Sequence, residues 1–570
     1  LRFTRDKKTG LVIEEKQGEY TVNRTYDNEG NCTHITSNLG ADIRHAYDQE
    51  GNLQSMQVGE NWQALWVRDN TGLEVQRTYS GNVTIRTERD RFGREVHKTV
   101  RIGNIERGAY RYEWGIANRL LSKENELTGT VMRYDYDRFD FLIRQESTKG
   151  SATDVIYRVP DFVGNLYGTP EKKDRKYGAG GRLLEDTLCF YHYDDEGNLV
   201  FREFKELQNN SVIHDRKRIE KEQGVHCLAT GSGWLYEWAS NGMLKRVIRP
   251  DGRPVNLCYD ALGRRTAKRY SEKITRWIWD GNVPLHEWCY KAIDFQSDEE
   301  ENTSPQKPAE NVTTWVFEEG TFVPTAKIQD GKLYSIVSDY MGTPIQMYNV
   351  QENKIWDCTL DIYGKVIAVD KGTEFDCPFR FQGQYADEET ELYYNRFRFY
   401  TPSTGCFISQ DPIKLAGNNP TLYGYVFNTN IWVDLFGLRK IKSTKTINGT
   451  KIYGKGQITG LGHDKATEKL AENLAHTGKY KEIYMDLSWN TANHTSSGTY
   501  QNISKKRPDL ILVDYNNKLY SIEIASKSDN IGDLKQRNNI SVSYGYGYLD
   551  KKDYDANGNI INDTNIKHLH

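Results

Sequence analysis

The sequence has little proline, no paired cysteine motif and no long apolar run, and these absences argue against several kinds of protein and site. Its eight cysteines are scattered, with no CxxC pair and no histidine cluster beside them, so neither a zinc site nor a disulfide framework is indicated. No apolar run long enough to span a membrane occurs, and the first residues contain no apolar signal-peptide stretch. We therefore expect a soluble chain without a membrane-spanning segment.

Charge is also uninformative, because the formal net charge of −3 gives no general argument for binding nucleic acid. The chain begins at Leu1 rather than Met. We expect it to be a fragment or a processed product, and any export to use a dedicated machine.

What the chain does contain is an excess of aromatic residues and glycine, with 37 Tyr, 12 Trp and 48 Gly against 14 Pro. This balance is typical of aromatic strands joined by glycine turns. Much of it lies in a repeated pattern, Tyr-Asp-x-x-Gly-x-Leu/Val, seen for example as YDNEGNCTHI and YDALGRRTAKRY. The copies begin at Tyr26, Tyr47, Asp90, Tyr136, Tyr193, Tyr236, Tyr259 and Asp361.

The repeat has the chemistry of a β-hairpin. Its Asp accepts backbone N–H groups at the start of a turn, and its Gly supplies the positive φ that closes the turn. The Tyr ends one strand, and the apolar residue after Gly begins the next. Alternating runs between copies, such as RRTAKRYSEKITRWIW, predict strands of period two.

This pattern resembles the YD-repeat, or Rhs, family. The resemblance implies a mainly β fold in which a strip of hairpins spirals into a hollow shell around a C-terminal passenger. Shells of that family are usually longer, so residues 1–378 are expected to form all or only part of one. The acidic, proline-containing segment 295–311 is predicted to be an exposed loop or insertion.

Residues 379–438 resemble the segment that closes Rhs shells, through QDPI, LAG, Y-x-YV-x-N and W-x-D-x-x-GL. The resemblance implies self-cleavage between Leu438 and Arg439. Two carboxylates, Asp411 and Asp434, would form the catalytic pair, and Arg398 would orient one of them.

The chemistry of such a pair is plausible on general grounds. Two carboxyl groups brought close together share a proton, so one serves as general base and the other as acid. Two positions depart from the family pattern: Thr401 stands in place of Asp, and Leu435 in place of Pro.

After Leu438 the repeat ends and residues 439–570 become rich in Lys and Asn. The pattern predicts a helix over about 464–476, a short strand at 482–487, and a hairpin of strands 509–514 and 519–526. A Pro-Asp that opens one strand and an acid in its neighbour indicate a divalent-metal site, because carboxylate oxygens bind Mg²⁺.

This arrangement resembles the PD-(D/E)XK nucleases, so a small α/β toxin domain of restriction-endonuclease type is expected. Asp509, Glu523 and Glu468 would be catalytic and hold Mg²⁺ or another divalent metal. The usual lysine position is Ala525, so Lys527 would have to replace that lysine. A three-residue turn at 516–518 would place Asp509 and Glu523 on one face, and a two-residue turn on opposite faces; the sequence leaves both registers open.

The favoured hypothesis is an interbacterial Rhs effector. It would be made in the cytoplasm, exported by delivery machinery such as type VI secretion, and neutralised in the producer by a cognate immunity protein. DNA is the favoured substrate and RNA the alternative, and basic residues could engage phosphates: Lys440, Lys442, Lys445, Lys505, Lys506 and Arg507. The alternatives are an encapsulated toxin of other chemistry and a YD-repeat cell-surface adhesion scaffold.

Overall fold

The computed structural model describes residues 1–438 apart from 50, 71, 292–308 and 415–420. Beyond them it describes the strands of the C-terminal part given below, with residues 471, 474, 475 and 479. The chain divides into two compact units, one of Leu1 with residues 79–440 and one of residues 2–78 with 441–570. Within the part described, no helix is of the length and apolarity that crossing a membrane requires.

The predicted turn chemistry of the repeat is present. In the copy at Tyr259, the Asp260 carboxylate accepts the N–H groups of Leu262 and Arg264, each at 2.9 Å. Gly263 has a φ of 72°, a conformation that other residues adopt only at a cost. The Tyr259 hydroxyl donates to the carbonyl of Leu244 on the preceding strand at 2.7 Å. This repeat therefore closes one hairpin and ties it to the strand before.

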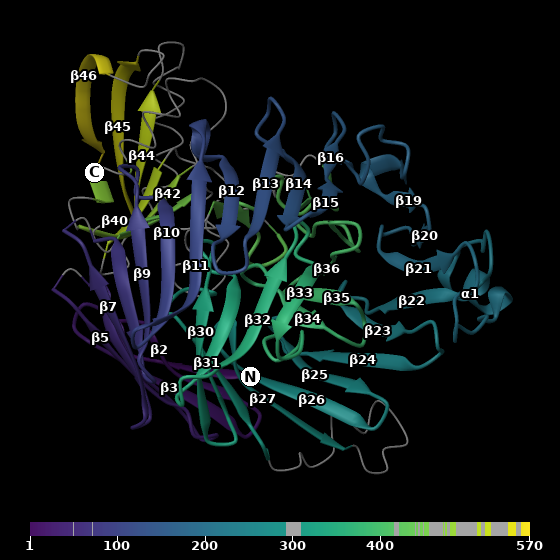
Figure 1. Ribbon diagram of the computed structural model, residues 1–570, viewed down its shortest axis with the longest axis horizontal. Coiled ribbons are helices and arrows are strands. Elements are labelled where there is room, and N and C mark those ends of the chain that lie inside the picture. Colours follow the sequence, from purple (N-terminus) through teal and green to yellow (C-terminus); the bar gives the residue numbers. More distant parts are fainter. Residues whose placement is uncertain are drawn as a thin grey trace. The chain divides into compact units, whose positions relative to one another are not determined.

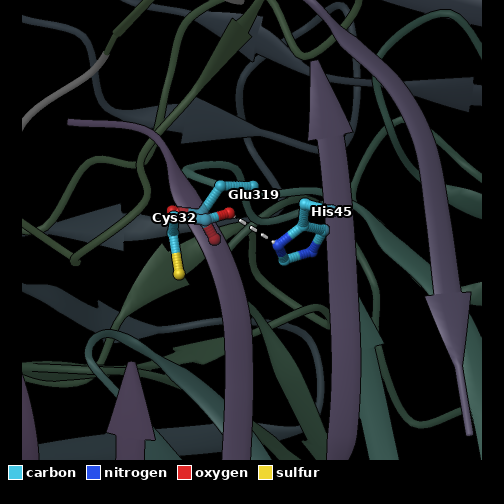
Figure 2. A group of neighbouring side chains, drawn as sticks. All are labelled: Cys32, His45 and Glu319. Carbon is cyan, nitrogen blue, oxygen red and sulfur yellow. Dashed lines mark hydrogen bonds between the residues drawn. The ribbon is translucent and has the colours of Figure 1, made fainter. Parts of the chain in front are cut away.

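The N-terminal part of the second unit is a run of such hairpins. Consecutive strands pair antiparallel from β1 to β7. Inside this run the His45 ring donates through Nδ1 to the main-chain carbonyl of Cys32 at 2.9 Å, the dashed line in Figure 2. The strands are β1 (Arg2–Arg5), β2 (Val12–Gln17), β3 (Tyr20–Tyr26), β4 (Cys32–Ser37), β5 (Asp42–Tyr47), β6 (Leu53–Val58), β7 (Trp62–Arg68) and β8 (Glu74–Tyr79).

The first unit continues the pattern of antiparallel neighbours. Its first strands are β9 (Val83–Arg89), β10 (Glu95–Ile102), β11 (Ile105–Trp114), β12 (Leu120–Asn125), β13 (Thr130–Tyr136), β14 (Leu142–Lys149) and β15 (Ala152–Tyr157). Two short strands follow, β16 (Val159–Pro160) and β17 (Leu166–Tyr167). Single 3₁₀ turns lie at Ile116–Asn118 and Ala179–Gly181. The described helix α1 (Arg216–Gln223) begins at Asp215, whose side chain accepts from the N–H of Arg218, and ends at Gly224.

A sixteen-stranded sheet, β18 to β33 in sequence order, forms the main body of this unit, and its hairpins β22 to β27 follow one another in Figure 1. Its strands are β18 (Lys176–Tyr177), β19 (Leu183–Glu185), β20 (Cys189–Tyr193), β21 (Leu199–Phe204), β22 (Gly233–Trp238), β23 (Leu244–Ile248), β24 (Pro254–Tyr259), β25 (Arg265–Tyr270), β26 (Lys273–Asp280), β27 (Val283–Lys291), β28 (Thr313–Phe317), β29 (Pro324–Gln329), β30 (Lys332–Ser338), β31 (Pro344–Asn349), β32 (Lys354–Leu360) and β33 (Val366–Lys371). Residues 295–308 of the predicted insertion lie outside the described residues.

A small four-stranded sheet then carries the segment that the sequence singled out. It consists of β34 (Tyr385–Asp387), β35 (Leu392–Asn395), β36 (Arg398–Thr401) and β37 (Cys406–Phe407), and β38 (Trp432–Val433) follows it in the chain. One face packs into a buried aromatic cluster that includes Tyr393, Tyr400, Phe407, Tyr425 and Trp432. The three residues Arg398, Asp411 and Asp434 of the same segment are buried as well.

The C-terminal part forms a mixed sheet in the order β40 to β46. Its pairs β41–β42 and β44–β45 are parallel and the other pairs antiparallel. Residues 471, 474 and 475, between β41 and β42, are helical, and Ala471 and Ala475 are buried against the sheet. The strands of this sheet are β40 (Lys445–Ile447), β41 (Thr450–Gly454), β42 (Tyr480–Met485), β43 (Leu510–Asp514), β44 (Leu519–Ala525), β45 (Gly545–Tyr554) and β46 (Ile560–Leu569), and the short strand β39 (Ile441–Lys442) precedes it in the chain without belonging to it.

Candidate autoproteolytic site

The candidate site is built on a tight hairpin between β35 and β36. Asn395 and Arg398 are directly paired across it, so the turn holds only Arg396 and Phe397. Arg396 has a φ of 60°, a value required by two-residue hairpin turns that follow the twist of the strands. As a result, the side chains of Asn395 and Arg398 leave the hairpin end on the same face.

Arg398 is the centre of the site. Its Nη2 lies 3.0 Å from Asp411 Oδ2 and 3.5 Å from Asp434 Oδ2, so one guanidinium nitrogen reaches both predicted carboxylates. Its Nη1 donates to the carbonyl of Leu422 at 3.2 Å, and its Nε donates to the carbonyl of Gly437.

Arg398 is fully buried, and its guanidinium carbon lies 3.7 Å from the centre of the Phe407 ring. Burial lowers the pKa of Arg398, whereas Asp411 and Asp434 raise it in opposition. Even a lowered value leaves an arginine charged at neutral pH. The site therefore contains a fixed positive charge between two acids.

Asp411 lies just after β37, where its N–H donates to the carbonyl of Leu422 at 2.8 Å. Its Oδ1 accepts the N–H of Ile413 at 2.9 Å. Burial raises the pKa of Asp411 to about 6; Arg398 and the Ile413 N–H lower it in part, and Asp434 adds a small upward contribution. A carboxyl with such a pKa exchanges its proton near neutral pH, as general acid–base catalysis requires.

Asp434 holds the chain that leads to the predicted cleavage bond. Its Oδ1 accepts the N–H groups of Leu438 at 3.0 Å and Phe436 at 3.4 Å. Gly437, between them, has a φ of 67°, and a Cβ there would lie 2.6 Å from the carbonyl oxygen of Asn395. The turn from Asp434 to Leu438 thus requires glycine for its conformation and for its close approach to the hairpin.

The structure therefore brings together Arg398, Asp411 and Asp434, although the two acids lie 23 positions apart in the sequence. It also places Leu438 beside them. Arg439, on the other side of the predicted bond, lies outside the described residues.

Sequence reasoning missed three neighbours of this site. The side-chain amide of Asn395 donates to the main-chain carbonyl of Asp434 at 2.8 Å, and the N–H of Asp434 donates to the Tyr425 hydroxyl at 3.4 Å. Phe407 supplies the ring under Arg398. All three lie in the family-like segment, but their residue types carry no catalytic signal, so only contacts reveal them.

Comparison with known protein families identifies the family to which the shell belongs. The Teneurin YD-shell family matches residues 73–432. The chain belongs to this family. The mainly β fold of YD hairpins, predicted from the repeat, is thereby confirmed, and the candidate site lies at the end of the YD shell.

Relatives of this YD-shell chain include bacterial toxins. It is 26% identical to "Probable deoxyribonuclease RhsA" of Dickeya dadantii, over 83% of this chain and 32% of that protein. It is 27% identical to "Double-stranded DNA deaminase toxin A" of Burkholderia cenocepacia, over 77% of this chain and 30% of that protein. The chain spans about a third of the length of these relatives.

Among solved structures, a structure of the Photorhabdus luminescens Tc holotoxin pore is similar to this chain. The match covers 74% of this chain and 21% of that one. Its TM-score is 0.49 at 18% identity.

The residues predicted for the passenger are described only in part. Asp509, Glu468 and Lys527 lie outside the described residues. The main chain of Glu523 lies in β44 opposite Leu549 of β45. The predicted hairpin is confirmed as β43 and β44.

Its register corrects both alternatives, because Ile511 faces Ser521 rather than residue 522 or 523. The last pair that the structure describes before the turn is Val513 with Leu519. Ser521 and residue 523 are two positions apart in the strand and so share a face. As the three-residue turn would have done, this register therefore places positions 511 and 523 on one face of the sheet.

Proposed function

We propose that this chain is part of an interbacterial Rhs effector whose shell cuts off its own C-terminal passenger between Leu438 and Arg439. The observation that carries the proposal is the position of Arg398, whose guanidinium contacts Asp411, Asp434 and the carbonyl of Gly437 together. Names of relatives support the toxin class, since they include a deoxyribonuclease and a deaminase toxin.

In the proposed reaction, a water oxygen adds to the Leu438 carbonyl carbon and gives a proton to ionised Asp434. The Leu438–Arg439 C–N bond then breaks, and the protonated Asp411 supplies a proton to the leaving nitrogen. The products are a carboxyl group on Leu438 and an amine on Arg439, and one water is consumed. The raised pKa of Asp411 supports its role as the acid.

Arg398 holds the two acids and the segment before the bond in one geometry. It stays charged throughout and transfers no proton. The bond is part of the same chain, so its high effective concentration replaces a binding step. One event per molecule is sufficient.

Mass spectrometry of the purified chain tests this proposal. We expect two fragments, with a new N-terminus at Arg439 in the second, and a single uncut chain in Asp411→Asn and Asp434→Asn. A suitable control is Asp361→Asn, because Asp361 is another buried acid with a pKa raised by burial to about 6 but lies in a repeat turn. An uncut wild-type chain, or cutting at another bond, contradicts the proposal.

For the passenger we propose a Mg²⁺-dependent nuclease acting on DNA, with RNA as the alternative substrate. Asp509, Glu523 and Glu468 would hold the metal, which would activate water and offset charge on the phosphate. Lys527 would contact the water or a phosphoryl oxygen. The register of the β43–β44 hairpin supports this assignment, because it places positions 511 and 523 on one face of the sheet.

The test is degradation of plasmid DNA and of RNA with Mg²⁺ by the released passenger, compared with Asp509→Ala/Glu523→Ala. A double variant as active and as toxic as the wild type contradicts the nuclease proposal. The relative named a DNA deaminase toxin supports a second candidate, base deamination; it predicts base changes in DNA without strand breaks.

Partners follow from this function. We propose that delivery machinery exports the effector into the target-cell cytoplasm and that a cognate immunity protein protects the producer. Co-expression with the neighbouring reading frame tests the second point, since an immunity protein should restore growth and bind residues 439–570.

A further inference from the structure

The hairpin end of β35 and β36 holds the segment before the proposed cut through three successive contacts. Asn395 Nδ2 donates to the carbonyl of Asp434 at 2.8 Å. The N–H of Phe397 donates to the carbonyl of Phe436 at 3.2 Å, and Arg398 Nε donates to the carbonyl of Gly437. We name these three donors the carbonyl clamp.

The clamp acts on main-chain oxygens and therefore fixes position without selecting side chains. Of its three members, only Asn395 and Arg398 use side chains, and Arg398 already belongs to the proposed catalytic group. Asn395 is fully buried, and its amide nitrogen contacts Asp434 at the start of the turn. A Cβ on Gly437 would lie 2.6 Å from the main-chain carbonyl oxygen of Asn395, so the end of the turn approaches the hairpin closely at a glycine.

We infer that Asn395 is a positioning residue for self-cleavage and that Gly437 is required for the close approach of the cleaved segment to the hairpin. The inference rests on the proposed autoproteolysis. Asn395 fixes the main chain of Asp434 through its side-chain amide, and the absence of a side chain at Gly437 permits the close approach of the end of the turn to the hairpin. A displacement of about 1 Å in a reacting group costs about 100-fold in rate.

The clamp also determines what happens after the cut. All three carbonyls precede the proposed bond, so hydrolysis breaks none of their hydrogen bonds. The new carboxyl end at Leu438 therefore stays in the site, beside Arg398 and Asp434, and blocks a second substrate.

The test uses the full chain made by cell-free synthesis, with the cut fraction followed over time. Asn395→Leu removes the donor, and Asn395→Asp turns it into a carboxylate that repels the Asp434 carbonyl. Both should cut about 100-fold more slowly, at the same bond and with an unchanged pH dependence, because the acid–base pair is intact. Asn428→Asp is the matched control: Asn428 is equally buried, its side chain accepts only the N–H of Asn430 in the contacts described, and it should cut normally.

Gly437→Ala and Gly437→Asn probe the clamp from the other side and keep the test informative if the Asn395 variants misfold. Asn tolerates positive φ better than Ala, so slow cutting by both variants assigns the effect to the contact with Asn395. Cutting at the wild-type rate by folded Asn395→Leu, or by both Gly437 variants, overturns the inference. If instead Asp411→Asn also cuts normally, the proposed function itself fails.

Discussion

Replacing Asp411 by Asn should abolish cleavage without unfolding the shell, and the structure gives the magnitudes. Burial raises the pKa of Asp411 from 3.8 to about 6, which corresponds to about 3 kcal/mol of cost for ionising it in the folded chain. A neutral amide avoids this cost at pH 7. It also places an N–H₂ group against Arg398, which costs about 1–3 kcal/mol. The two terms nearly cancel, so we expect a change in unfolding free energy below about 2 kcal/mol.

The pH dependence separates this substitution from Asp434→Asn, although both chains should be uncut and of equal length. A carboxyl whose pKa is raised by folding stabilises the folded state below its unfolded pKa, and this stabilisation is lost as pH rises through the folded value. Asp434→Asn, which retains Asp411, should therefore lose stability between about pH 3.8 and pH 6.

Asp411→Asn should lack this pH-dependent loss of unfolding free energy, which amounts to about 3 kcal/mol. The assay is thermal unfolding of both variants across this pH range, with far-UV circular dichroism to establish folding. Parallel pH profiles would refute the assignment of the raised pKa to Asp411. A cut Asp411→Asn chain would refute its role in the reaction.

Three further results are expected. Arg398→Lys should slow cleavage by about 100-fold, measured by fragment formation over time, because a lysine lacks the fork that bonds two carbonyls and an acid; wild-type rates would contradict this. For Glu203, burial opposes ionisation but His192 and three main-chain N–H groups outweigh it and lower the pKa to about 2, so Glu203→Gln should cost about 3 kcal/mol of unfolding free energy at pH 7. The difference in unfolding free energy between wild type and Glu203→Gln should vanish as pH falls from about 4.5 towards 2, as followed by thermal unfolding. A difference that does not depend on pH would show that the lowered pKa of Glu203 is not its cause. Chelation of divalent metal should stop DNA degradation by the released passenger, and activity that survives EDTA would exclude the Mg²⁺ proposal.

The sequence by itself determined the repeated architecture. In a repeat such as that at Tyr259, the acid, the glycine and the flanking strands lie within a few residues of one another. The bonds that Asp260 accepts and the φ of Gly263 are local consequences of those residue types. A hairpin strip can therefore be predicted without knowing what it packs against.

Tertiary structure decided the geometry of the candidate site. Asp411 and Asp434 were singled out by resemblance to a family, but their shared contact with Arg398 depends on three separate segments meeting. The raised pKa of Asp411 depends on burial by those segments. Asn395 had no signal of its own, because an asparagine at a hairpin end is common and its contact with Asp434 joins distant positions.

The register of the passenger hairpin also needed the structure. Turn length sets which residues face each other, and the polar residues between β43 and β44 suit several lengths. Pairing of Ile511 with Ser521 was settled by the packing of both strands within a larger sheet. Local turn chemistry thus specifies the hairpins, whereas long-range packing specifies where their side chains meet.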